Sequence, residues 1–267
     1  MCADVPADQT GYTYSDGRPA PCSALSSNCG SVSALCPETC NACGGVTQRW
    51  TKPYERKNFE ISSECTSTER SKLIAADALK DDMCADMLYC MKEKTATCQS
   101  QVTKWFGGSV SDTSQWDTLY QGFARICSSN NYKYNCRPTG CKISFTYGGT
   151  RYNDAEQTSI PANVRDAFIQ QCQTSGCGYS ATIAYVYSNR VNEREQNLCP
   201  IGFWLQKDYH DVNGLGSKAT TIVHELSHFV DLAGTDDLSY SPQEHLSAAQ
   251  SNPWQYLDNA ATWYVFF

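Results

Sequence analysis

The stretch His224-Glu225-Leu226-Ser227-His228 decides how this chain is interpreted. On an α-helix, residues i and i+4 lie on one face about one turn apart, so His224 and His228 can offer two imidazole nitrogens to one tetrahedral metal ion. Glu225 lies beside that metal without binding it, and its carboxylate can take a proton from a water whose pKa the metal has lowered to about 7. The pattern is typical of zinc sites that hydrolyse peptide bonds.

The same five-residue pattern also occurs on ordinary helices, where the histidines and the glutamate cover a solvated face. Two of the four histidines of the chain fall in this motif, between the apolar pairs Ile222-Val223 and Phe229-Val230. These pairs predict a buried helix, and a buried Glu225 needs a polar partner such as a water on a metal ion. The surroundings therefore favour the catalytic interpretation.

Composition excludes several classes of protein. With 267 residues, of which 41% are hydrophobic and 12% aromatic, the chain has enough apolar material for one core and a small appendage. A net charge of -7 and no basic stripe argue against nucleic acid or an anionic membrane as partner. No apolar run reaches the roughly 18 residues that span a bilayer. The N-terminus lacks a basic region followed by an apolar one, so we expect a removed signal peptide or numbering from the mature chain.

Sixteen cysteines indicate an oxidising compartment and hence a secreted protein. A segment of 43 residues cannot bury enough surface to fold alone, so its cysteines predict a three-disulfide module over residues 1–43. A zinc ribbon is the alternative, but it needs two C-x-x-C pairs and only Cys40-Asn41-Ala42-Cys43 qualifies. The six cysteines of this segment are Cys2, Cys22, Cys29, Cys36, Cys40 and Cys43.

Residues 44–62 carry Gly44-Gly45, Pro53 and scattered charges without a clean period, which predicts a linker. The capping box from Thr66 to Glu69 starts the helices that we expect up to about residue 95. The periodicity predicts a second helical stretch over 115–126, a strand that enters a hairpin turn at 148–149, and strands over 181–187 and 202–205.

We expect the motif helix to run from about Lys218 to Leu232 and to stop at Gly234. The chain can then fold back and bring a further ligand to the metal from outside the helix. Ser241-Pro242 combines an N-cap with proline at the first helical position, so another helix starts there, and a last one starts at 252–253.

Three kinds of residue compete as the third metal ligand. A histidine ten residues after His224 is excluded, because that position is Gly234. Glu244 is the best glutamate, but its place in a capping box already gives it a structural task. Asp237 is the remaining strong candidate, although spacing alone does not separate it from Asp236.

The motif followed by G-T-x-D-x-x-Y over residues 234–240 resembles the aspzincins, the family of deuterolysin and peptidyl-Lys metalloendopeptidase. Residues 104–107, 184–190 and 199–204 are similar as well, and the resemblance covers residues 63–267. It implies an α+β, zincin-like metallopeptidase domain, mostly helical with a small sheet, that holds one zinc ion.

The resemblance also implies roles for individual residues. Asp237 would be the third ligand, Glu225 the general base, and Tyr240 a hydrogen-bond donor to the tetrahedral oxyanion. The alternative for Tyr240 is an aromatic side chain packed near the helix end. The family pattern further implies the disulfides Cys177–Cys199 and Cys65–Cys172.

One departure from the family concerns substrate choice. Lysine-specific members carry Asn-Ala-Asp-x-x-Glu in the last helix, where the acidic residues can neutralise a substrate lysine. Here the stretch is 259–264, and the corresponding residues Ala261 and Tyr264 carry no charge. We therefore expect a neutral S1′ pocket without strict lysine selection. The strand over 181–187 would be the edge along which an extended substrate pairs.

The first 43 residues, which end in C-x-x-T-C-x-x-C, resemble the ShK toxin-like module. The stretch between Cys29 and Cys40 lacks the lysine-tyrosine pair of potassium-channel blockers. We therefore expect an accessory module that docks substrate or an extracellular ligand or shields the active site, with a simple spacer as the alternative.

The leading hypothesis is a secreted zinc endopeptidase that acts on proteins and peptides. The first alternative is a non-catalytic extracellular module that keeps the fold for binding or structure. A hydrolase for small molecules on the same metal site is the second, and a closed pocket instead of an open cleft would distinguish it.

Overall fold

The computed structural model describes residues 59–138, 141, 144–153, 160–170, 172, 176–178, 182–208 and 216–266. The chain divides into two units, Met1–Pro53 and Tyr54–Phe267, and all described residues belong to the second. The predicted module over 1–43 and most of the predicted linker lie outside them. Within the described ranges, no helix has the length and apolar character needed to cross a membrane.

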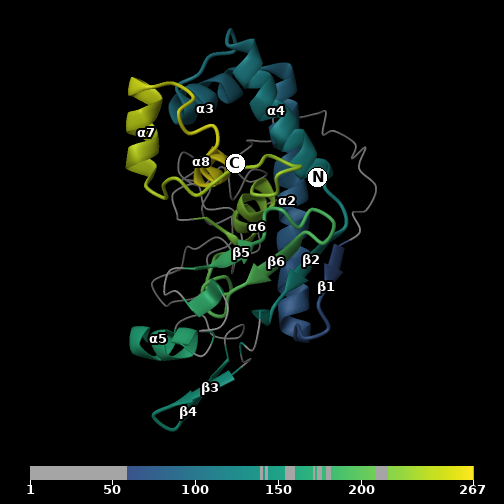
Figure 1. Ribbon diagram of the computed structural model, residues 1–267, viewed down its shortest axis with the longest axis vertical. Coiled ribbons are helices and arrows are strands. Elements are labelled where there is room, and N and C mark those ends of the chain that lie inside the picture. Colours follow the sequence, from purple (N-terminus) through teal and green to yellow (C-terminus); the bar gives the residue numbers. More distant parts are fainter. Residues whose placement is uncertain are drawn as a thin grey trace, which may run out of the picture. The chain divides into compact units, whose positions relative to one another are not determined.

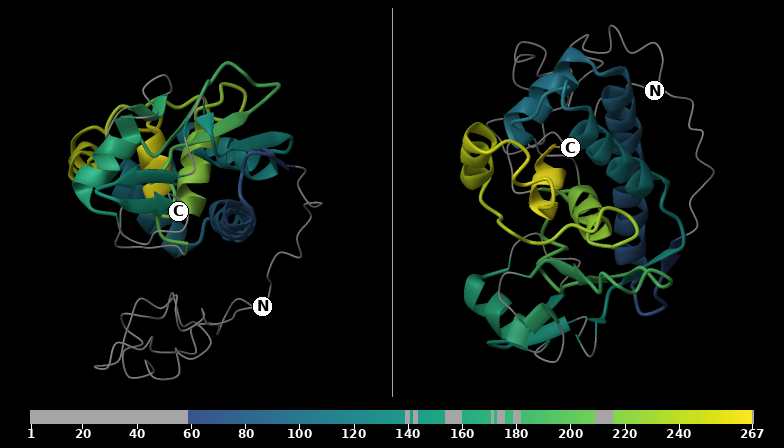
Figure 2. Two further views of the ribbon diagram at one scale, coloured as in Figure 1. Left: turned by 90° about the horizontal axis from the view of Figure 1, so that it is seen from below. Right: turned by 45° about the horizontal axis from the view of Figure 1, so that its top comes forward.

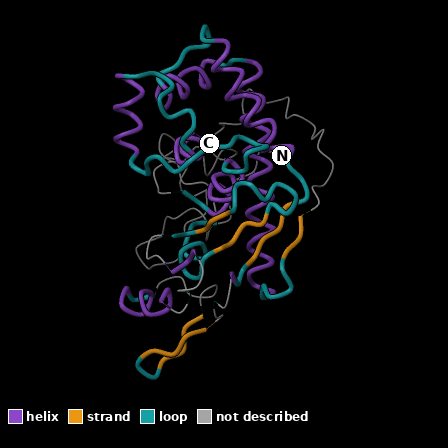
Figure 3. Tube along the Cα trace, viewed as in Figure 1, coloured by secondary structure: helices purple, strands orange, loops and turns teal. Residues whose placement is uncertain are grey.

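Four short strands form the main sheet, drawn in orange in Figure 3. β1, β2 and β6 pair in parallel, and β5 pairs antiparallel with β6 at one edge. In sheet order the strands are β1 (Phe59–Ile61), β2 (Tyr132–Asn135), β6 (Glu195–Leu198) and β5 (Ala184–Val186). The prediction of a strand over 181–187 is therefore confirmed in its central residues, and this strand lies at an edge.

Residues 59–61, expected at the end of the linker, instead form β1. The ring of Phe59 lies 5.9 Å from that of Tyr132 and 5.6 Å from that of Tyr134. This aromatic contact and the pairing with β2 make the segment part of the domain.

Helices account for most of the remaining structure. The capping box at the start of α2 is confirmed, since the Thr66 side chain accepts from the Glu69 backbone and the Glu69 side chain from the Thr66 backbone. The helices are α2 (Ser67–Glu93), α3 (Ala96–Phe106), α4 (Thr113–Ser128), α5 (Ala162–Gln170), α6 (Lys218–Ser227), α7 (Pro242–Ser251) and α8 (Ala260–Phe266).

A small hairpin of β3 (Ser144–Tyr147) and β4 (Thr150–Asn153) forms a second sheet, as predicted. Gly148 and Gly149 connect the strands with φ of 56° and 81°. Two consecutive positive φ values are what a two-residue hairpin turn requires, and glycine adopts them without steric cost.

The motif helix α6 lies in the middle of the domain. It packs against α2, α4 and α8 and against the sheet strands β5 and β6. Figure 1 shows it between α8 and the sheet, and in the left view of Figure 2 its long neighbour α2 is seen nearly end-on. All ten residues of α6 are buried, so the prediction of a buried motif helix is confirmed.

Three expected elements have different bounds. The motif helix ends at Ser227 and not near 232, because Thr235 returns to bond its backbone N–H to the Ser227 carbonyl. Residues 202–205 form turns, with Ile201 at a φ of 67°, and not a strand. The last helix starts at Ala260, after a series of turns over 253–258.

Five disulfides join the ten cysteines between 65 and 199. Cys177–Cys199 is confirmed, whereas Cys65–Cys172 is wrong. The Ser62 backbone N–H bonds to the Tyr134 carbonyl and continues the pairing of β1 with β2, which brings Cys65 beside Cys136. Cys172 pairs with Cys141, and the remaining bridges are Cys84–Cys127 and Cys90–Cys98.

Candidate metal centre

His224 and His228 lie one turn apart at the C-terminal end of α6. Their Nε2 atoms are 3.2 Å apart and their rings are perpendicular, with centroids separated by 4.8 Å. The α-helical spacing of i and i+4 thus directs both nitrogens to one point, as the motif predicts.

His228 is held by a backbone group on the segment that follows the helix. The Nδ1 atom of His228 lies 2.8 Å from the Thr235 carbonyl oxygen, and a carbonyl can only accept, so this nitrogen carries the proton. The backbone of Ala260 lies close enough to His224 to contribute to raising the pKa of its imidazole. The protonated Nδ1 of His228 leaves the lone pair of its Nε2 atom available for a metal.

Asp237 brings a carboxylate oxygen to the same point. Its Oδ1 atom lies 3.3 Å from Nε2 of His224 and 3.5 Å from Nε2 of His228. Four tetrahedral ligands at the usual zinc bond lengths of about 2.0–2.1 Å lie about 3.3–3.4 Å from one another. The three measured separations therefore match three corners of a zinc tetrahedron, and two nitrogens with one oxygen are a donor set that zinc accepts.

The structure does not bring the other two candidate ligands to this point. Among the described residues, the group of potential ligands around the histidines contains Asp237 but neither Asp236 nor Glu244. The backbone of Asp236 pairs with residues 258 and 260, and the Glu244 carboxylate accepts a hydrogen bond from the Ser239 hydroxyl.

Glu225 follows the first histidine and is 4% exposed. Burial raises the pKa of its carboxyl to about 7, with His224 lowering it and Asp237 raising it. A bound cation would favour the ionised form. A carboxyl whose pKa lies near neutrality can both take up and release a proton, which suits a general acid–base group.

The pKa of the Asp237 carboxyl is shifted in the opposite direction, below its ordinary value. Burial raises its pKa, but hydrogen bonds from His224 and Tyr240 outweigh burial and lower the pKa to about 2. Asp237 is therefore ionised at neutral pH, which is the form that binds a metal.

Tyr240 lies next to these residues with its side chain largely in solvent. Its ring centroid is 5.9 Å from that of His224, its hydroxyl hydrogen-bonds to Asp237, and it is 60% exposed. Exposure of this degree argues against the alternative of an aromatic packed near the helix end.

The two predicted pocket residues lie on α8. Ala261 is buried, and the side chain of Tyr264 lies outside the described residues. Sequence reasoning missed Asn259, just before α8, whose side chain bonds to the backbone of residues 238 and 239. Its only signal in the sequence is its place as the first residue of the 259–264 stretch.

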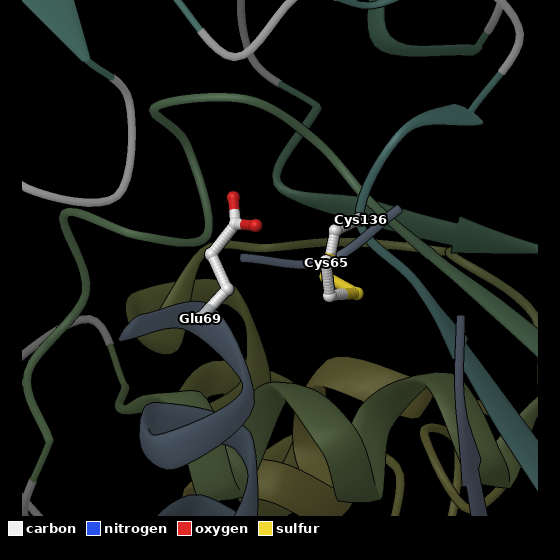
Figure 4. A group of neighbouring side chains, drawn as sticks. All are labelled: Cys65, Glu69 and Cys136. Carbon is white, nitrogen blue, oxygen red and sulfur yellow. A yellow bond between two sulfur atoms is a disulfide. The ribbon is translucent and has the colours of Figure 1, made fainter. Parts of the chain in front are cut away.

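A second group of potential ligands, Cys65, Glu69 and Cys136, is shown in Figure 4. The two cysteines form a disulfide, so neither offers a thiolate. Glu69 is paired with Arg137, with Oε1 2.6 Å from the guanidinium nitrogen. This group is therefore a structural cluster and not a metal site.

Residues 149–267, somewhat less than half of the chain, match the aspzincin family model, which is described as lysine-specific metallo-endopeptidase. The chain is 34% identical over 162 residues to an extracellular protease of Aeromonas hydrophila, an alignment that covers 58% of this chain and 44% of that protein. The chain thus spans less than half of the length of this relative.

Two fungal proteins are similar over more of their length. The peptidyl-Lys metalloendopeptidase of Pleurotus ostreatus is 29% identical over 196 residues, covering 73% of this chain and 89% of that protein. The solved structure of a zinc peptidase from Grifola frondosa aligns with a TM-score of 0.52 at 25% identity, over 76% of this chain and 95% of that one.

Proposed function

We propose that this chain, whose similarities support the aspzincin family and a peptide-bond hydrolase, is a secreted zinc endopeptidase. In this proposal His224, His228 and Asp237 hold one zinc ion and Glu225 is the general base. The observation that carries the proposal is the triangle of the two histidine Nε2 atoms and the Asp237 Oδ1 atom, which lie 3.2–3.5 Å apart. The buried carboxyl group of Glu225 directly follows His224 in the sequence. Three protein ligands leave one position for water or substrate, which is the pattern of catalytic zinc.

Bound zinc would lower the pKa of a water molecule and polarise the scissile carbonyl group. Glu225 takes a proton from the attacking water and then gives a proton to the leaving amine. Burial of Glu225 makes its carboxylate a stronger base than that of an exposed glutamate, which favours the first step.

Tyr240 donates a hydrogen bond to the oxyanion of the tetrahedral intermediate. Its hydroxyl is bonded to Asp237 in the structure, so the phenol has to turn from Asp237 towards the substrate oxygen. A side chain that is 60% exposed has room for such a rotation. A donor aimed at the developing charge stabilises the transition state more than the bound substrate.

The substrate lies along β5, whose outer edge can pair with an extended peptide. At P1′ the enzyme accepts apolar or mixed side chains, because Ala261 and Tyr264 supply no negative charge for a lysine. The cysteines, all paired within the described residues, fit an extracellular protein. The 1–43 segment is an ShK-like accessory module whose ligand would be extracellular.

Mass-spectrometric mapping of cut sites in a denatured protein mixture tests the proposal. The zinc-loaded chain is compared with the same chain in a zinc chelator and with Glu225→Gln. We expect cleavage by the wild type alone, with zinc content unchanged in Glu225→Gln because this substitution removes no ligand. A folded, zinc-loaded wild type that cuts nothing would contradict the proposal and favour a non-catalytic module, whereas cleavage restricted to small peptides would favour a small-molecule hydrolase.

A further inference from the structure

Asp237 lies between α6 and α7 on a segment without regular secondary structure, so its position depends on what holds this segment. On the N-terminal side, the Asp236 backbone N–H bonds to the Asp258 carbonyl at 2.8 Å, and the Ala260 N–H bonds to the Asp236 carbonyl at 2.9 Å. These bonds form a short parallel bridge between Asp236 and Asn259.

On the C-terminal side of Asp237, the side chain of Asn259 binds the segment. The Oδ1 atom of Asn259 accepts from the backbone N–H groups of Leu238 at 2.9 Å and Ser239 at 3.2 Å. Its Nδ2 atom lies 3.0 Å from both the Ser239 carbonyl and the Thr262 hydroxyl. Backbone N–H groups only donate, so the orientation of the amide is fixed by chemistry.

Asn259 is fully buried, and its amide uses both hydrogens and accepts twice. His245 of α7 adds to this arrangement, with Nε2 3.0 Å from the Ser239 carbonyl and 3.0 Å from Asn259 Nδ2. Because both Nδ2 hydrogens have other acceptors, the His245 Nε2 atom carries a proton and donates to the Ser239 carbonyl. The hydrogen bonds of the buried Asn259 amide thus restrict the conformation of this segment.

We propose that Asn259 is a positioning residue for the metal centre. Its amide fixes the backbone at 238–239 and thereby the Asp237 carboxylate before it and the Tyr240 phenol after it. The backbone of the neighbouring Ala260 lies close to His224. The 258–260 segment thus positions the aspartate ligand beside the histidines. This inference rests on the proposed zinc site, but not on peptide hydrolysis.

The test compares the zinc-loaded full chain with Asn259→Ala and Asn259→Asp. Asn135→Ala is the matched control, because Asn135 also accepts from a backbone N–H, of Arg137, and donates to side chains, but within the sheet. Zinc affinity is measured by competition with a chromophoric chelator, coordination by the visible spectrum of the cobalt-substituted protein, and folding by thermal denaturation. Peptide hydrolysis at saturating zinc gives kcat and KM.

We expect Asn259→Ala to weaken zinc binding by about 10–100-fold, as loss of groups that orient metal ligands does. The cobalt spectrum should change, and kcat should fall with KM within roughly threefold of wild type. Asn259→Asp keeps the acceptor for the two N–H groups, so it should recover part of the affinity. Asn135→Ala should lower the melting temperature without changing zinc affinity or the cobalt spectrum.

Wild-type zinc affinity and cobalt spectrum in folded Asn259→Ala would overturn the inference. If Asn259→Ala does not fold, the test rests on Asn259→Asp, for which we expect a zinc affinity between those of the wild type and of a His224→Ala variant. An affinity equal to either of these two would contradict the inference. A wild type that binds zinc through Asn259-dependent positioning but cuts no peptide would leave the inference supported and overturn only the proposed function.

Discussion

The Nδ1 atom of His228 lies 2.8 Å from the carbonyl oxygen of Thr235, so the side chain of a proposed metal ligand is tied to the loop that carries Asp237. The loop is anchored to α6 a second time, since the Thr235 N–H bonds to the Ser227 carbonyl and the hydroxyls of Ser227 and Thr235 are 2.7 Å apart. The helix and the loop are therefore joined at two points, and the Asp237 carboxylate lies beside the histidines although it is outside the helix.

Tyr240→Phe removes the hydroxyl that we assign to the oxyanion. Loss of one oxyanion donor lowers kcat by about 10²–10³-fold in enzymes of other folds, and we expect a decrease of this order with little change in KM. Steady-state hydrolysis of a fluorogenic peptide measures both constants. An unchanged kcat would show that the phenol has no part in the reaction.

The metal-free protein should lose stability as pH rises through 7. Burial raises the folded-state pKa of Glu225 from 4.5 to about 7, so between these values the folded chain binds more protons than the unfolded chain. Above pH 7 the folded chain must ionise a buried carboxyl, at a cost on the order of 3 kcal/mol.

Glu225→Gln has no such ionisation. In the presence of a chelator, we expect the variant and the wild type to have similar stability near pH 4.5 and the variant to be more stable at pH 8. Urea unfolding at a series of pH values measures the difference. A difference that does not change with pH would contradict the assigned pKa.

Acidic side chains placed at the uncharged positions 261 and 264 should create a preference for lysine at P1′. Ala261→Asp combined with Tyr264→Glu restores the acidic pair of the lysine-specific pattern, and we expect the fraction of cuts before lysine to rise by roughly tenfold, since a buried charge needs an opposite charge. Cut-site mapping measures the preference, with Ala261→Asn and Tyr264→Gln as the uncharged control. A strong lysine preference in the wild type would refute the argument.

Local chemistry explains which parts of this structure could be predicted from sequence. The capping box at Thr66, the glycine pair at 148–149 and the spacing of His224 and His228 each act over a few residues, and the structure has all three. The helix α3 is not predicted, although Thr95 caps it and Gly107 ends it, because its apolar positions are few. The early end of α6 and the pairing of Cys65 with Cys136 depend on distant backbone contacts that no local pattern encodes.

The same limit applies to the candidate site. Asp237 and Asp236 are equivalent by spacing, and only the fold separates them: the Asp236 backbone pairs with residues 258–260, whereas the Asp237 carboxylate lies beside the histidines. Asn259 could not be identified because its role depends on contacts with residues about 20 positions away.

The most direct test of the zinc centre compares Asp237→Asn with Asp236→Asn, two identical changes at neighbouring positions. Zinc per chain is measured by elemental analysis after dialysis, together with hydrolysis of a peptide substrate. We predict one zinc per chain with activity in the wild type and in Asp236→Asn, and loss of zinc and activity in Asp237→Asn. Full zinc content and activity in Asp237→Asn would contradict the assignment of Asp237 as a ligand and, with it, the proposed centre.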